Sequence, residues 1–161
     1  MSHLSKTTPI GREKNMTKDS LKAMFSSERH DWATPLEIVQ AQVDYPFDLD
    51  VCALESNSKA EKFYTPEMNG LIQPWVGKCF LNPPFGREIP KWIERAYIES
   101  QKEYCYSVTA LLPARVDTSW FHEWIWNCSW SQTIFLRGRI KFVGADNSAP
   151  FPSMITRWKR K

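Results

Sequence analysis

Short apolar runs of β-forming residues alternate along this chain with stretches whose apolar residues recur at helical spacing. Residues 47–51, 78–81 and 106–112 are strand-like, and residues 90–102 place apolar side chains three or four positions apart. Such alternation predicts an α/β domain in which helices cover a largely parallel sheet. Sheets of this kind bind ligands beyond the carboxyl ends of their strands, so the residues after each apolar run are the first candidates for a site.

Further elements complete this prediction. A helix is expected from Pro35 to about Val43. Thr34 is its predicted N-cap, Pro35 takes its first position and Glu37 completes a capping box. The remaining expectations are loops over residues 54–74, a helix capped by Asp117 that holds Trp120, Phe121, Trp124 and Ile125, and strands at 133–136, 140–143 and 154–158.

One small domain accounts for the predicted fold. A chain of about 150 residues buries roughly 70% of the surface that its unfolded form exposes. The 161 residues of this chain can therefore form one core without disulfide or metal staples. Residues 1–30 are polar, rich in lysine and without periodicity, so we expect them to form a flexible leader before a domain of residues 31–161.

The cysteines and the hydropathy of the chain indicate the cellular environment in which the protein works. The four cysteines form no C-x-x-C pair, and no signal peptide precedes them. This pattern predicts reduced thiols in a cytoplasmic protein that has neither a disulfide framework nor a metal site. No apolar run approaches the roughly 18 residues of a membrane span, so no membrane association is expected.

Positive charge is concentrated near the C-terminus. The chain has 21 basic and 18 acidic residues, but seven of the basic residues and one acidic residue lie from Arg137 onwards. The other 14 basic and 17 acidic residues give the rest of the chain an excess of negative charge. We therefore expect the segment from Arg137 to contact phosphates.

The strand-like run that ends at Leu81 stops at the tetrapeptide Asn82-Pro83-Pro84-Phe85. Each proline biases the residue before it towards an extended conformation, so this segment is stiff and Asn82 is held where the strand opens. A purely structural alternative is a turn at a strand end, in which asparagine forms the turn and phenylalanine belongs to the core.

A stiff asparagine–proline pair suits the activation of an exocyclic amine. The amine of adenine or cytosine is a poor nucleophile because its lone pair is delocalised into the ring. The side-chain oxygen of Asn82 and the backbone carbonyl of Pro83 can accept the two N–H hydrogens of such an amine and make its lone pair available. Phe85 can then stack on the base.

Several short blocks along the chain resemble the phage-type DNA N6-adenine methyltransferases of the Dam class, from about Trp32 to the C-terminus. The blocks are WATP (32–35), DLDVCA (48–53), NGL (69–71) with Trp75, FLNPPF (80–85), LLPAR (111–115) with DTSWFH (117–122), and GRIKF (138–142) with Ala149, Pro150 and Ser153. The resemblance implies a Rossmann-like methyltransferase fold, S-adenosylmethionine as the methyl donor and DNA as the partner. On this basis we hypothesise direct in-line transfer of the methyl group from sulfur to the nitrogen of a flipped adenine, which needs no general base.

The same resemblance implies a cofactor site made of two segments. Its residues are Trp32, Thr34 and Pro35, of which the last two line the methionine end, and Asp50, Val51, Cys52 and Ala53 in the loop after the first strand. The Asp50 carboxylate can accept from the cofactor amine or ribose, and the alternative is that it caps a helix or forms a turn. The glycine-rich loop that is usual after the first strand of methyltransferases is missing.

Arginine and lysine side chains supply the candidate DNA contacts. Arg115 follows a predicted strand end and can meet a phosphate, or else form a surface ion pair. Arg137, Arg139 and Lys141 alternate, so as a strand they would share one face beside Phe142. The alternative for these three is an edge strand that is protected by its charges.

The expected activity is methylation of the N6 amine of adenine in DNA. Alternatives that use the same tetrapeptide are methylation of cytosine N4, RNA guanine or protein glutamine. A further alternative is a catalytically silent nucleic-acid-binding module. We expect no obligatory protein partner, and a location in the host bacterial cytoplasm if a phage or prophage encodes the chain.

Overall fold

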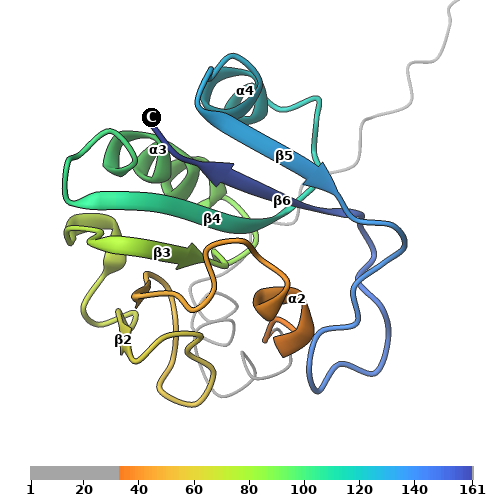
Figure 1. Ribbon diagram of the computed structural model, residues 1–161. Coiled ribbons are helices and arrows are strands. Elements are labelled where there is room, and N and C mark those ends of the chain that lie inside the picture. Colours follow the sequence, from red (N-terminus) through yellow and green to blue (C-terminus); the bar gives the residue numbers. More distant parts are fainter. Residues whose placement is uncertain (1–32, 161) are drawn as a thin grey trace, which may run out of the picture.

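The computed structural model describes residues 33–160, which contain a six-stranded sheet with helices on both faces (Figure 1). Trp32 and the predicted leader of residues 1–30 lie outside the described residues. The strands are β1 (Leu49–Asp50), β2 (Lys62–Phe63), β3 (Gly77–Leu81), β4 (Cys105–Pro113), β5 (Ser131–Phe135) and β6 (Ser153–Trp158). The helical elements are α2 (Leu36–Gln40), the 3₁₀ turn η2 (Gly70–Ile72), α3 (Ile89–Glu99), α4 (Ser119–Phe121) and the π-helical turn η3 (His122–Trp126).

The sheet is mixed and mostly parallel. Its strand order is β2-β1-β3-β4-β6-β5. β1 pairs in parallel with β2 and β3, and β3 pairs in parallel with β4. β6 lies antiparallel between β4 and β5, so it is the reversed strand of this sheet. The predicted α/β class and largely parallel sheet are therefore confirmed in this coarser form.

The strand order changes direction at β1. The chain passes from β1 to β2 on one side and then returns to form β3 on the other side of β1. The loops that leave the carboxyl ends of β1 and β3 therefore separate, and such a point in an open α/β sheet leaves a crevice in which ligands bind.

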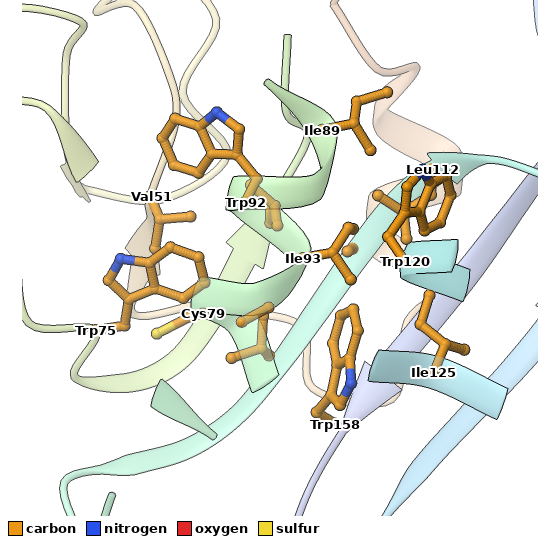
Figure 2. Close-up of a cluster of buried hydrophobic side chains, with 14 of the residues drawn as sticks. Val51, Trp75, Cys79, Ile89, Trp92, Ile93, Leu112, Trp120, Ile125 and Trp158 are labelled. Atoms are coloured by element: carbon orange, nitrogen blue, oxygen red, sulfur yellow. The ribbon is translucent and has the colours of Figure 1, made fainter. Parts of the chain in front are cut away.

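One face of the sheet is covered by α3, α4 and η3 around an aromatic core. Figure 2 shows Trp92 of α3 beside Trp75, with Ile93 of α3 and Trp158 of β6 further along the same core. The apolar spacing of α3 places these side chains on one face of the helix. Val108, Ala110 and Leu112 also belong to this cluster because alternate residues of β4 point to the same face.

The opposite face is covered by α2 and by residues 136–152, which we call the basic loop. Val39 of α2 packs with Phe80 and Leu111 of the sheet, and Ile140 and Phe142 of the basic loop join them. Figure 1 shows the basic loop, in blue, on the same side of the sheet as α2. Burial of each large side chain of this kind contributes about 1.5–3 kcal/mol.

A buried ion pair fixes the turn after α2 to β6. Arg157 Nε and Nη2 donate to the two carboxylate oxygens of Asp44 at 2.6 and 2.8 Å, and Asp44 is 4% exposed. Thr109 of β4 adds a hydroxyl donor to the same carboxylate. Burial raises the pKa of Asp44, but the hydrogen bonds and charge of Arg157 outweigh this effect, so the pKa lies below its ordinary value.

The predicted start and end of the first helix are wrong. Pro35, rather than Thr34, is the N-cap of α2, and no side chain caps the helix. The Thr34 hydroxyl instead accepts a hydrogen bond from Asn82. α2 ends at Gln40, before the predicted Val43.

Residues 140–143 do not form the predicted strand. They belong to the basic loop, where Val143 makes one isolated bridge with Ala33. Gly138 and Gly144 have φ angles of 74° and 83°, so left-handed turns bracket the segment and direct it away from the sheet. The alternation of buried and exposed residues that suggested a strand is present nevertheless, because Ile140 and Phe142 face the core.

Two smaller expectations also need correction. Thr118, rather than Asp117, caps α4, and its hydroxyl accepts from the backbone N–H of Phe121. The helix is brief and continues as the π-helical turn η3. The region 54–74, expected to be loops, contains the short strand β2 and the turn η2.

Candidate active site

The predicted site residues after the strands lie at one edge of the sheet. β1, β3, β4 and β5 run in the same direction, so their carboxyl ends share that edge. The loop after β1 (residues 51–59), the Asn-Pro-Pro-Phe motif (residues 82–85), Arg115 and the basic loop each follow one of these ends. We call this side of the sheet the carboxyl edge.

Asn82 is held by a hydrogen bond to a residue far away in the sequence. Its Nδ2 donates to Thr34 Oγ1 at 3.0 Å, and Thr34 is 1% exposed. Because the amide nitrogen faces Thr34, the acceptor oxygen Oδ1 is the other end of the side chain. Pro83 is buried and Pro84 is half-buried, so the motif is anchored directly after Asn82.

Phe85 packs against two aromatic rings of the basic loop. Its ring centroid lies 6.0 Å from that of Phe142 and 5.1 Å from that of Phe151, with interplanar angles of 65° and 62°. Edge-to-face pairs of this kind contribute about 0.5–1.5 kcal/mol beyond area burial. Phe85 stays half-buried, so its orientation is fixed while part of its surface remains accessible.

Asp50 organises the loop after β1. Its Oδ1 accepts from the backbone N–H of Cys52 at 3.3 Å, and its Oδ2 accepts from that of Lys59 at 2.9 Å. Asp50 is 3% exposed, and Val51, the next residue, donates its backbone N–H to Phe80. These contacts give Asp50 the turn-forming role that the sequence left open beside cofactor binding.

A cavity of about 420 Å³ lies where the loops after β1 and β3 separate. Its lining residues are Val51, Cys52, Tyr64, Thr65, Pro66, Asn69, Gly70, Leu71, Pro84, Glu88 and Trp92. Val51 and Cys52 are predicted cofactor residues, and Pro84 belongs to the Asn-Pro-Pro-Phe motif. Ala53 is buried beside this loop and is not among the lining residues.

Residues 69–71 form a wall of this cavity that sequence reasoning alone did not assign to a site. A Cβ atom on Gly70 would lie 2.1 Å from the carbonyl oxygen of Val51, so only glycine fits this close approach. Trp75 Nε1 donates to the Gly70 carbonyl at 2.8 Å. Asn69 has a φ of 56°, and the signal for this wall was an asparagine–glycine pair, which favours such left-handed turns.

The predicted DNA-binding cations at the carboxyl edge are exposed. Arg115 lies in the loop after β4, and Arg137, Arg139 and Lys141 lie on the basic loop rather than on a strand. Ile140 and Phe142 anchor that loop in the core beneath them. The loop is therefore a fixed support for the three cations.

The basic C-terminal segment is divided between two edges of the sheet. Because β6 runs in the reverse direction, Lys159 and Arg160 lie at the opposite edge from the basic loop. Arg157 is engaged by Asp44, and Lys159 donates to the Tyr106 hydroxyl at 2.8 Å. The segment from Arg137, which was expected to contact phosphates, therefore does not form one continuous surface.

Metal clusters and membrane-spanning helices are both missing from the part of the chain that the structure describes. Between residues 33 and 160, no three histidine, cysteine or acidic side chains gather as they would around a metal ion. In the same range, every helix is too short or too polar to cross a lipid bilayer.

Comparison with known proteins gives the site a context. Residues 22–155 match the family model described as DNA N-6-adenine-methyltransferase (Dam). The DNA N-6-adenine-methyltransferase of Haemophilus phage HP1 is 33% identical over 135 residues, which cover 80% of this chain and 73% of the phage protein. That of Escherichia phage T1 is 40% identical over 97 residues, which cover 57% of this chain and 39% of the phage protein. The chain belongs to the DNA N-6-adenine-methyltransferase (Dam) family.

Proposed function

We propose that this protein methylates the N6 amine of adenine in DNA and that the Asn-Pro-Pro-Phe motif holds the flipped base. The observation that carries the proposal is the oriented Asn82 at the carboxyl end of β3, next to the crevice at which the strand order changes direction. Membership of the Dam family supports both the reaction and a Rossmann-like fold for the sheet.

The cavity between the loops after β1 and β3 fits S-adenosylmethionine. Small-molecule sites typically enclose 300–1,000 Å³ and combine apolar walls with a few polar groups. This cavity, of about 420 Å³, has Leu71 and Trp92 as apolar walls and Asn69 and Glu88 as polar groups. S-adenosylmethionine supplies a methyl group on a sulfonium sulfur, which keeps the C–S bonding pair while the adenine nitrogen takes the methyl and releases one proton. Asp50 shapes the loop that lines the cavity.

Asn82 and Pro83 activate the target amine. Asn82 Oδ1 and the Pro83 carbonyl accept its two N–H hydrogens, which draws the nitrogen towards a tetrahedral geometry with its lone pair available. The stiffness of the proline pair fixes both acceptors before the base arrives, so little reorganisation is needed at the moment of transfer.

Phe85 stabilises the base outside the duplex. Flipping costs a few kcal/mol, and stacking on an aromatic side chain returns about 1–3 kcal/mol per base. Because Phe142 and Phe151 pack against the Phe85 ring, the ring does not have to be ordered during binding. Arg115, Arg137, Arg139 and Lys141 bind phosphates at the same edge and position the strand.

An Asn82→Ala variant tests this assignment. We expect kcat for DNA methylation to fall at least about 100-fold, as on removal of a transition-state hydrogen-bond partner. Binding of S-adenosylmethionine, measured by calorimetry, stays nearly unchanged. Asn127→Ala, at an exposed asparagine far along the chain, is the matched control and keeps full activity.

Product analysis completes the test. Nucleosides from methylated DNA are separated by chromatography, and we expect N6-methyladenine from the unaltered protein. Formation of N4-methylcytosine instead would reassign the substrate base. Full activity in Asn82→Ala would remove the motif from the reaction.

A further inference from the structure

Thr34 contacts the reactive motif although 48 positions separate it from Asn82. The two side chains meet through a hydrogen bond in which Asn82 Nδ2 donates to Thr34 Oγ1 at 3.0 Å. Thr34 is almost completely buried, so water does not readily compete for the hydrogen bond between Thr34 and Asn82. In this bond the nitrogen end of the Asn82 amide faces Thr34, so the oxygen end points away from it.

The two ends of an amide are nearly equal in shape but opposite in hydrogen bonding. An amine that offers two N–H hydrogens needs the oxygen of Asn82, whereas the nitrogen end would repel it. If the Asn82 amide rotated by half a turn, its nitrogen would face the target amine in place of its oxygen, and the site would be unproductive. In this structure Thr34 engages the nitrogen end, which leaves Asn82 in the productive orientation.

The segment that carries Thr34 is itself held firmly. The backbone carbonyl of Ala33 accepts from the N–H of Val143 in the basic loop at 3.0 Å. On the other side, the Pro35 carbonyl accepts from Ile38 in the first turn of α2. Thr34 is thus fixed between a helix and the basic loop, and its hydroxyl is a rigid reference point for Asn82.

We propose that Thr34 is a positioning residue, which holds the Asn82 amide with its oxygen towards the target amine. This inference rests on the proposed function. It assigns Thr34 a role through Asn82 rather than the role of lining the cofactor site that the resemblance implies. The two roles predict different kinetic effects, because one changes the rate of transfer and the other changes affinity for the cofactor.

Thr34→Val removes the hydroxyl and keeps the shape of the side chain. We expect kcat at saturating S-adenosylmethionine to fall about tenfold, the effect of losing one buried hydrogen bond. The Kd for S-adenosylmethionine and the KM for DNA should stay within about twofold of the unaltered protein. Thr34→Ser restores the hydroxyl, and we expect it to recover most of the missing rate.

Matched variants separate positioning from folding. Thr156→Val removes the hydroxyl of another fully buried threonine, which bonds to Thr133 in the middle of the β5–β6 pair, and should lower the thermal midpoint without changing kcat. If valine at position 34 prevents folding, Thr34→Ala and Thr34→Ser give the same comparison.

Two results would overturn the positioning role. One is a weakened Kd for S-adenosylmethionine with an unchanged kcat in Thr34→Val, which would assign the hydroxyl to the cofactor. The other is equal rates for the valine and serine variants and the unaltered protein. Because the unaltered protein is assayed in parallel, failure of adenine methylation itself is a separate outcome that concerns the proposed function.

Discussion

The loops after β1 and β3 lie side by side but are held in different ways. The side-chain contacts of the loop after β1 are local, since the Asp50 carboxylate accepts backbone N–H groups within the next nine residues, as far as Lys59. The Asn-Pro-Pro-Phe motif is held from elsewhere in the chain. Thr34 bonds to Asn82, and rings of the basic loop pack against Phe85.

This difference predicts which of the two loops responds to substitutions elsewhere in the protein. A loop with local contacts keeps its shape as long as its own residues are intact. The motif depends on α2 and the basic loop being docked on the sheet, so changes far from it in sequence reach its geometry. We therefore expect remote substitutions to affect transfer through the motif more than binding through the loop after β1.

The largest expected effect comes from breaking the ion pair that docks the turn after α2. Arg157→Leu leaves the Asp44 carboxylate buried without its cation, and this should lower the free energy of unfolding by about 3–5 kcal/mol. The folded fraction should also lose activity because the segment that carries Thr34 is less firmly held. Urea unfolding and kcat measure the two effects.

An exposed ion pair is the control for this prediction. Lys91 and Glu88 pair on the surface of α3 with side chains 66% and 38% exposed, so Lys91→Gln should change the free energy of unfolding by less than about 1 kcal/mol. Equal losses in the two variants would contradict the importance assigned to Arg157.

The same pair gives stability a pH dependence. The pKa of Asp44 in the folded protein lies below its unfolded value of about 3.9, so its contribution is present above that pH. The contribution is lost as the pH falls through the folded pKa. Urea unfolding of the unaltered protein should therefore lose stability below about pH 4, and Asp44→Asn should lack this part of the slope.

A smaller effect is expected from the loop after β1. Asp50→Asn leaves one acceptor oxygen for the two N–H groups of Cys52 and Lys59, so the free energy of unfolding should fall by about 1 kcal/mol. The Kd for S-adenosylmethionine should rise a few-fold while kcat at saturation is kept. Asp117→Asn, at an exposed position, is the control, and a loss of kcat larger than the loss of affinity would contradict the separation of the two loops.

Patterns that are local in sequence predicted much of this fold. The apolar runs that became β3, β4 and β6 and the spacing of α3 needed only neighbouring residues to be recognised. The position of the Asn-Pro-Pro-Phe motif at a strand end was likewise predicted, because prolines restrict the residues next to them.

The parts that were missed depend on contacts between distant residues. Thr34 has the sequence context of a helix cap, and its bond to Asn82 is visible only after folding. The segment 140–143 has the alternation of a strand, but the turns at Gly138 and Gly144 direct it away from the sheet, where Phe142 packs on Phe85. The cavity wall at Gly70 follows from the approach of Val51, which a single sequence does not reveal.

The smallest expected effect distinguishes the two edges that carry basic residues. Neutralising Arg137, Arg139 and Lys141 together should reduce the slope of log K for DNA against log salt by about 1 for each phosphate that the variant no longer neutralises. Affinity for S-adenosylmethionine should not change, because these side chains lie on the basic loop outside the cavity.

The opposite edge supplies the control for the salt experiment. Lys159→Gln with Arg160→Gln removes charge at the end of β6, away from Asn82, so the slope should stay close to that of the unaltered protein. Fluorescence anisotropy of a labelled duplex between roughly 50 and 200 mM salt measures both variants. If the variant at Lys159 and Arg160 reduces the slope as much as neutralisation of the basic loop does, DNA binds both edges of the sheet equally. The phosphate contacts would then have to be reassigned away from the carboxyl edge.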